Sequence, residues 1–362
     1  MQKLIVTLIA ISISVSFILI AAFLNFHIEY SVQAQNSIDT QKTFQLHIPT
    51  TISKEAQELM RLFNMDPFDY ELPDPNDPDE LKKFSGEIES LGLKVSQSTR
   101  DLFSPNITET RLGGLNVLDI KPKNWKDNGK VLVYTHGGGN WLLSAQSTLS
   151  NSVLAANSTG LRVISLDYPL APFSKWDQTT DEVMNAIRAL LSQEGYSHED
   201  IAIYGDSAGG GLAVASVLKM RDNGIGMPAA VVLWSPRVDL SQRGDTYFTL
   251  SHADIYLKGK PAPNRTAHPY ASVKDLKNPY VSPVYGNFSK GFPPTLIQGG
   301  TKEFLLSDFV RLYQALDQAK VEVKLDVYEG MPHVFQSLFA NTTESDIALS
   351  KMNDFLRLHL DY

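Results

Sequence analysis

Residues 201–210 read Ile-Ala-Ile-Tyr-Gly-Asp-Ser-Ala-Gly-Gly, and this stretch decides the fold. Its first four residues form a short apolar run that predicts a buried strand, and a helical pattern follows from about Leu212. Between them stands G-x-S-x-G, in the strand–turn–helix context that this motif requires. The flanking glycines fit a turn that is too tight for a Cβ beside the serine. The stretch therefore predicts that Ser207 is a nucleophile raised above the edge of a sheet.

Similar short apolar runs recur on both sides of this stretch, and helical periodicity fills the gaps between them. The alternation predicts an α/β fold, with a mostly parallel sheet that is covered by helices on both faces. Residues 240–290 are too long for an ordinary loop, and we expect an insertion over the carboxyl ends of the strands, where such sheets bind ligands. The six predicted strands are 131–135, 162–167, 201–204, 230–234, 295–298 and 321–327.

A second glycine-rich turn follows the run at 131–135, where His136 precedes three consecutive glycines. Such a run leaves backbone N–H groups exposed and lets a carbonyl oxygen approach closely. An oxyanion hole needs both, and each of its donors can contribute about 3 kcal/mol to transition-state stabilisation. The N–H of Ala208 would complete the hole. A phosphate cradle is the competing interpretation, but the run matches neither common nucleotide-binding glycine pattern.

The combination of His-Gly-Gly-Gly upstream of Gly-Asp-Ser-Ala-Gly-Gly resembles the hormone-sensitive-lipase-like carboxylesterases of the α/β-hydrolase superfamily. Residues 167–172 are similar to the Y-R-L-A-P segment of that family, with Pro169 in place of the arginine. Residues 235–240 are similar to its S-P-x-x-D-L stretch. The likeness extends over about residues 50–360.

This resemblance implies an α/β-hydrolase domain over residues 51–362, with a helical lid built from about 51–105 and 240–285. It also implies that Gly138 and Gly139, together with Ala208, are the oxyanion donors. Neither a metal nor a cofactor is needed for such chemistry.

The predicted base and acid follow the nucleophile in the chain, in the order serine, acid, histidine that α/β-hydrolases use. His333 lies on a loop after the last apolar run, which would bring it within reach of Ser207. The family's acid motif reads D-x-L-x-D, and alignment on Leu305 places its catalytic aspartate at Glu303. A glutamate can hold the imidazole as an aspartate does. Asp308 is the alternative acid.

These residues predict a serine carboxylesterase that forms an acyl-enzyme, and the resemblance implies short- to medium-chain acyl esters as substrates. A lactonase or an amidase with the same triad remains an alternative. A non-catalytic ligand receptor on the same fold is a further one, although a receptor branch that resembles these esterases has lost the histidine that this chain keeps.

The amino terminus predicts export. Lys3 precedes an uncharged stretch, Leu4–Leu24, which is long enough to span a bilayer as a helix. Residues 1–34 are therefore a membrane anchor or a signal peptide cleaved near Ala34, with a slight preference for the anchor, and residues 35–50 are a tether. The net charge of −8 argues against a nucleic-acid partner. The chain has no cysteine, which excludes disulfides and thiolate metal sites.

Overall fold

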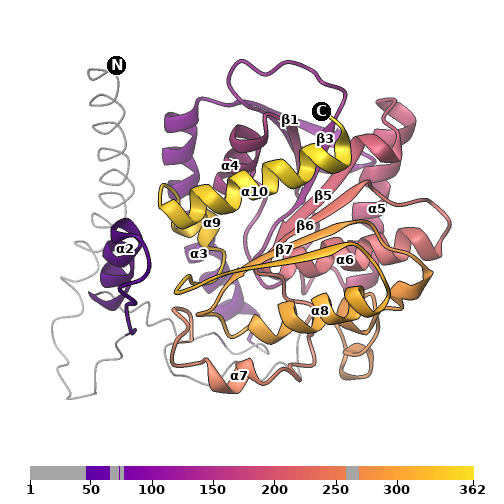
Figure 1. Cartoon of the computed structure of the whole chain (residues 1–362). Helices are drawn as coiled ribbons and strands as arrows, with labels where there is room; N and C mark the ends of the chain where they lie inside the picture. The colour runs from indigo at the N-terminus through magenta and orange to yellow at the C-terminus, as the bar shows by residue number, and fades with distance from the viewer. Residues whose placement is uncertain (1–45, 66–72, 74–76, 258–268) are drawn as a thin grey trace.

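The computed structural model describes residues 46–65, 73, 77–257 and 269–362. They form an α/β fold with one eight-stranded sheet in the order β1-β2-β4-β3-β5-β6-β7-β8 (Figure 1). The sheet is parallel from β4 to β8, whereas β2 pairs antiparallel with both β1 and β4. The strands are β1 (Asn106–Leu112), β2 (Leu115–Lys121), β3 (Val131–Thr135), β4 (Arg162–Leu166), β5 (Ile201–Asp206), β6 (Ala230–Trp234), β7 (Thr295–Gly300) and β8 (Val323–Tyr328).

Helices cover both faces of this sheet (Figure 1). On one face lie α4 (Leu149–Thr159) and α10 (Thr343–Leu360), and on the other lie α5 (Trp176–Gln193), α6 (Ser207–Asp222) and α8 (Leu306–Gln318). The central strand β5 shows why two layers form. Ile201 and Ile203 pack into the core beneath α5, α6 and α8, whereas Ala202 and Tyr204 pack into the core beneath α4 and α10, because successive side chains of a strand point to opposite faces.

The six strands predicted from apolar runs are confirmed, with boundaries that shift by up to two residues. The hairpin β1–β2 was not predicted, because β1 is an exposed edge strand with polar side chains at most positions. The helix after the nucleophile begins at Ser207, and the expected start near Leu212 was wrong. Glycines occupy the first turns of α6 and gave no apolar signal.

Two further helices precede the sheet, α2 (Lys54–Met65) and α3 (Pro78–Phe103). Ile52 and Met60 of the amino-terminal segment pack against Met331 and Phe335, which flank His333. Thr51 and Ser53 add hydrogen bonds to Glu329 and Glu344. The amino-terminal segment is therefore fastened to the loop that carries His333.

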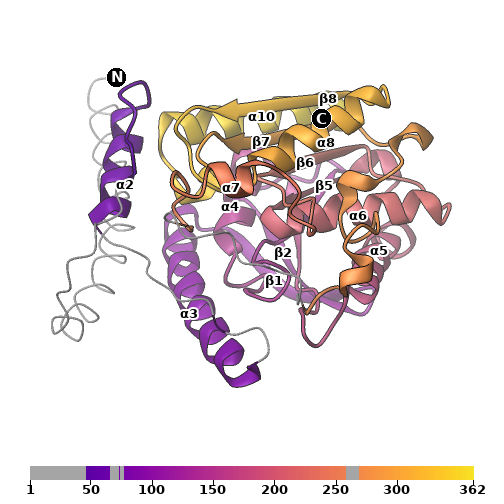
Figure 2. The same cartoon turned by 90° about the horizontal axis from the view of Figure 1, so that it is seen from below.

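The predicted insertion at 240–290 has little regular structure in its described part. It contains the short helix α7 (Thr246–Thr249), which lies beside α8 (Figure 2), and the 3-10 turns η2 (Val273–Asp275), η3 (Pro283–Tyr285) and η4 (Phe288–Lys290). Whether it forms a lid together with α2 and α3 stays a prediction. The segment Leu4–Leu24 and Ala34 lie outside the described residues. Among those that are described, no helix is long and apolar enough to cross a membrane.

Candidate active site

Ser207 lies at the junction of β5 and α6, at the carboxyl edge of the sheet. Its φ is +52°, a left-handed conformation that is strained for any residue with a Cβ. The flanking glycines allow it: a Cβ on Gly205 would come 2.5 Å from Thr135 Oγ1, and one on Gly209 would come 2.1 Å from the Thr135 carbonyl oxygen. The turn packs so closely against the end of β3 that only glycine fits beside the serine.

The predicted oxyanion loop follows β3 directly. Gly138 has a φ of +105°, and a Cβ there would come 2.1 Å from the carbonyl oxygen of Leu142. Gly137 is already engaged, because its N–H donates to Asp206 Oδ1 at 3.0 Å. The N–H groups of Gly138 and Gly139 make no hydrogen bond within the described ranges. The N–H of Ala208 belongs to the first turn of α6, where a helix offers it no carbonyl partner.

His136 supports this loop from inside the protein. Its ring stacks on Tyr168 at a centroid distance of 4.2 Å, and its Nδ1 donates to the carbonyl of Gly137 at 2.8 Å. The Tyr168 hydroxyl donates to the carbonyl oxygen of His136. Burial lowers the pKa of His136, so the ring is neutral at pH 7. These contacts suit a structural role for His136, which is to hold the loop in place.

His333 and Glu303 form a buried pair, with His333 Nδ1 2.7 Å from Glu303 Oε2. The other carboxylate oxygen of Glu303 accepts from Ser235 Oγ at 2.8 Å and from the N–H of Gly300 at 2.6 Å. Burial lowers the pKa of His333, but the hydrogen bond to Glu303 and the charge of that carboxylate outweigh it, so the pKa is raised. The pair can therefore hold one imidazole tautomer and stabilise its protonated form.

No hydrogen bond joins Ser207 to His333 in the part of the chain that the structure describes. The charge of Asp206, which precedes Ser207 in the chain, contributes to the raised pKa of His333.

Asp308, the alternative acid, lies in a different network. Its Oδ2 accepts from the N–H groups of Val238 and Asp239 at 2.8 and 3.0 Å, and from the hydroxyl of Tyr247. Burial raises its pKa to about 7. In this geometry the carboxylate that contacts His333 is that of Glu303.

Ser235 is a residue of the site that the sequence did not single out. Its Oγ donates to Glu303 and accepts from the N–H of Val334 at 2.9 Å, so it ties the acid to the histidine loop. Ser235 has a φ of +49°, the second strained serine at the carboxyl edge. Its place in the S-P-x-x-D-L stretch was the only signal that could have found it.

Asp254 is a second unpredicted residue near His333, and it lies fully buried in the insertion. One carboxylate oxygen accepts from the N–H of Phe304, next to Glu303, and the other accepts from the N–H of Tyr256. The ring of Tyr256 meets that of His333 edge-on at 5.6 Å. Burial raises the pKa of Asp254 to about 6. No motif surrounds this aspartate, so only the fold reveals it.

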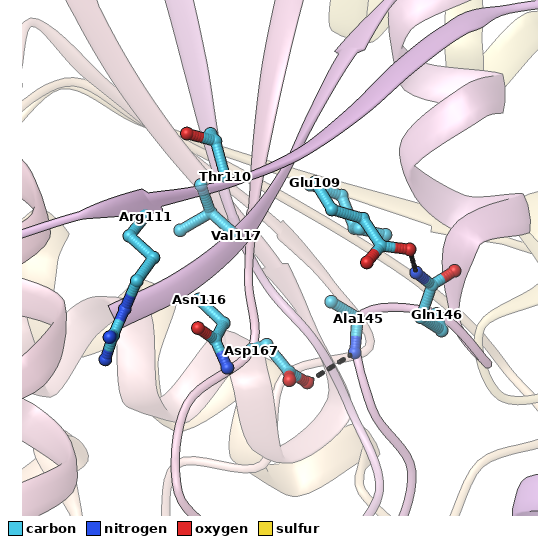
Figure 3. Close-up of a pocket in the computed structure, with 9 residues that line it drawn as sticks. Glu109, Thr110, Arg111, Asn116, Val117, Ala145, Gln146 and Asp167 are labelled. Atoms are coloured by element: carbon cyan, nitrogen blue, oxygen red, sulfur yellow. Dashed lines mark hydrogen bonds between the residues drawn. The ribbon is translucent and has the colours of Figure 1, made fainter. Parts of the chain in front are cut away.

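A pocket of about 330 Å³ lies elsewhere, over the β1–β2 hairpin and the loop before α4 (Figure 3). Its walls include Glu109, Gln146 and Asp167, and the first two are joined by a hydrogen bond. None of the predicted catalytic or oxyanion residues lines it. The predicted active-site residues at the carboxyl edge of the sheet therefore lie outside this cavity.

Comparison with known proteins identifies the family of the chain. The profile of a family described as alpha/beta hydrolase fold matches residues 132–337, which include both glycine-rich turns, Glu303 and His333.

Individual relatives are similar over most of their length. An esterase from Acinetobacter venetianus is 32% identical over 249 residues, which are 69% of this chain and 81% of that protein. An acetyl-hydrolase from Streptomyces hygroscopicus is 34% identical over 232 residues, 64% of this chain and 77% of that one. The crystal structure of a hormone-sensitive lipase from a metagenome library superposes with a TM-score of 0.73 at 30% identity, covering 84% of this chain and 99% of that one. The chain belongs to the α/β-hydrolase family, among the esterases that resemble hormone-sensitive lipase.

Proposed function

We propose that the protein hydrolyses small carboxylic esters, with Ser207 as nucleophile, His333 as general base and Glu303 as the acid that orients it. The observation that carries this proposal is the buried contact of 2.7 Å between His333 Nδ1 and Glu303 Oε2. The strained turn that holds Ser207 supports it. Catalytic hydrogen bonds often tighten only when substrate binds, so we expect the contact between Ser207 and His333 to form in the complex.

The reaction proceeds in two steps. His333 Nε2 takes the proton of Ser207 as the hydroxyl attacks the ester carbonyl, and the N–H groups of Gly138, Gly139 and Ala208 bind the oxyanion. His333 then protonates the leaving alcohol. Water attacks the acyl-enzyme by the same route in reverse, and the carboxylic acid leaves.

Several observations support this chemistry. Gly138 and Gly139 have N–H groups with no partner among the described residues, beside a serine at the amino terminus of a helix, where developing negative charge is favoured. The similar proteins named above include an esterase and an acetyl-hydrolase. We propose short- to medium-chain acyl esters as substrates, under a lid formed by residues 51–105 and 240–285. The intact contact between Glu303 and His333 favours catalysis over a receptor function.

Acyl-chain length and catalysis can be tested together. A p-nitrophenyl ester series from two to ten carbons should give its highest kcat/KM at eight carbons or fewer, and Ser207→Ala should abolish turnover. A fluorophosphonate should label wild-type Ser207 and leave Ser207→Ala unlabelled. If wild-type protein neither hydrolyses any acyl substrate nor reacts with the fluorophosphonate, the esterase proposal is wrong and a receptor function is favoured.

We also propose that the catalytic domain works outside the cytoplasm, anchored by Leu4–Leu24 with Lys3 on the inner side. The support is the length of the uncharged stretch and the charge that precedes it. Fractionation of the full-length chain should recover the activity with membranes. Release of active protein that begins at Gln35, without detergent, would exclude the anchor and favour a cleaved signal.

A further inference from the structure

A narrow cleft lies beside the predicted oxyanion hole, between one face of α6 and the insertion. It leaves about 10 Å³ free, room for a group about the size of one water molecule. The residues that line it are Asn140, Ala208, Gly211, Leu212, Ala215, Arg237, Leu240, Tyr270, Tyr280 and Val281. Ala208 and Asn140 connect it to the predicted active site, because Ala208 follows the nucleophile and Asn140 follows Gly139.

Arg237 brings a positive charge to this cleft. Only 5% of it is exposed. Its Nη2 donates to the carbonyl of Gly139 at 3.2 Å and to Asn140 Oδ1, while its Nε is buried and has no partner among the described residues. Within the same ranges Arg237 forms no ion pair with a carboxylate. A buried charge that forms no ion pair is costly. An anion bound beside the guanidinium would therefore stabilise it.

The cleft offers further donors but no free carboxylate. Arg237 Nη1 and Asn140 Nδ2 make no hydrogen bond within the described part of the chain. Neither atom is completely shielded from solvent. Because both residues are at least 95% buried and line the cleft, we infer that these two donors face it.

Asp308 is the acidic neighbour that could neutralise Arg237, and it does so only in part. It makes no ion pair with the guanidinium, since its Oδ2 is occupied by the backbone around Val238 and its Oδ1 has no partner in the described structure. Burial raises its pKa to about 7, so near neutrality it carries only a fraction of a charge. Burial also lowers the pKa of Arg237, as expected where counter-charge is deficient.

We propose that this cleft receives a carboxylate on the acyl group of the substrate, so that the preferred substrates are hemiesters of small dicarboxylic acids. The inference rests on the proposed esterase function. The acyl side follows from the lining: the leaving oxygen must face His333 to be protonated, and the cleft contains Ala208 and Asn140 but neither His333 nor Glu303. The small free volume suits a carboxylate oxygen at the end of a short acyl group.

The experiment compares monoethyl succinate with ethyl 4-methylpentanoate, a neutral ester of similar shape with the same leaving alcohol, by ethanol release. Wild-type protein should favour the hemiester in kcat/KM by tenfold or more, since a charge-assisted hydrogen bond is worth roughly that or above. Arg237→Met should lower this ratio by at least tenfold, and Arg237→Lys should retain part of it. The matched control is Arg221→Met at the far end of α6, where the Arg221 guanidinium binds the carbonyls of Asn287 and Gly291. This control variant should keep the wild-type ratio of kcat/KM for the two esters.

The ratio separates substrate recognition from loop support. Arg237 also holds Gly139, so Arg237→Met is expected to lose activity toward both esters, but loss of loop support alone would lower both rates equally. A wild-type preference for the neutral ester, or an unchanged ratio in a folded Arg237→Met, would overturn the inference.

If turnover of either ester is too slow, or Arg237→Met does not fold, wild-type protein gives the same comparison by protection of Ser207. Succinate should slow fluorophosphonate labelling at lower concentration than 4-methylpentanoate does, and the reverse order would count against the cleft. If the fluorophosphonate does not label wild-type protein at all, the esterase proposal itself fails, and this outcome is distinct from a failure of the cleft inference.

Discussion

Replacement of Glu303 by glutamine is the sharpest test of the predicted triad. In the wild-type protein Oε2 faces His333 Nδ1, while Oε1 accepts from Ser235 and Gly300. The carbonyl oxygen of a glutamine can keep the two contacts of Oε1, which forces its NH2 group toward His333. Two donors cannot share that contact. The imidazole must then move its proton from Nδ1 to Nε2, the atom that has to accept the proton of Ser207.

The size of the effect follows from this tautomer change. An analogous acid-to-amide substitution in a serine protease triad lowers kcat about 10⁴-fold, which corresponds to about 5 kcal/mol in the activation free energy. We expect a loss of this order for Glu303→Gln. The residual activity should also show a shifted pH profile. Because the hydrogen bond to Glu303 and its charge raise the pKa of His333 against the effect of burial, their loss lowers that pKa, and the acidic limb of kcat/KM moves to lower pH.

The assay is a pH series of kcat/KM with one p-nitrophenyl ester, accompanied by urea unfolding to show that the variant is folded. Asp308→Asn is the matched control, since Asp308 is equally buried and lies five residues along the chain but contacts the backbone of Val238 and Asp239 instead. It should stay within about tenfold of wild type, an effect of about 1.4 kcal/mol. Near-normal activity of a folded Glu303→Gln, or a large loss confined to a folded Asp308→Asn, would refute the assignment.

Three other substitutions test neighbouring parts of the site. Burial raises the pKa of Asp254 to about 6, so the folded protein binds a proton at this carboxylate more tightly than the unfolded chain does. The resulting contribution to stability is complete below about pH 4 and is lost as pH rises through 6. The free energy of unfolding of Asp254→Asn, relative to that of wild type, should therefore be higher at pH 8 than at pH 4 by about 1–3 kcal/mol, as measured by urea unfolding. The same variant-minus-wild-type difference at both pH values would contradict this. Gly138→Ala places a Cβ against the carbonyl of Leu142 and should lower kcat at least about 100-fold by displacing a donor; unchanged kcat would remove Gly138 from the hole. Ser235→Ala deletes a hydrogen bond to Glu303 and should cost about 1–2 kcal/mol of unfolding free energy, with a lower kcat and little change in KM. A neutral effect on both would show that Ser235 does not position the acid.

The parts of the fold that sequence could predict are those in which burial dictates composition. Strand β5 is buried at every position, so its apolar run stands out, and the same holds for β3 and β6. Strand β1 has one buried residue in seven and pairs on only one side. Its hydrogen bonds are made by the backbone, which leaves little trace in side-chain composition.

The candidate site divides along the same line. Ser207, Gly138 and His333 could be proposed from the sequence because the motifs that contain them follow a fixed order along the chain. Asp254 could not, because its role arises from an insertion that meets the loop of Glu303 only in three dimensions. The cleft at Arg237 likewise joins two segments almost 100 residues apart, through its bond to Asn140.

The fastening of the amino-terminal segment to the histidine loop has a consequence for the order of folding. Thr51 bonds to Glu329 across 278 residues, and Ser53 bonds to Glu344 across 291. Contacts of such separation are slow to form, and during synthesis the early segment has nothing to dock against until the last strand and α10 have left the ribosome. A nascent chain can bury the strands around the serine well before its histidine loop is held in place. The predicted catalytic residues would then reach their final arrangement only after the amino-terminal segment has docked against the histidine loop and α10.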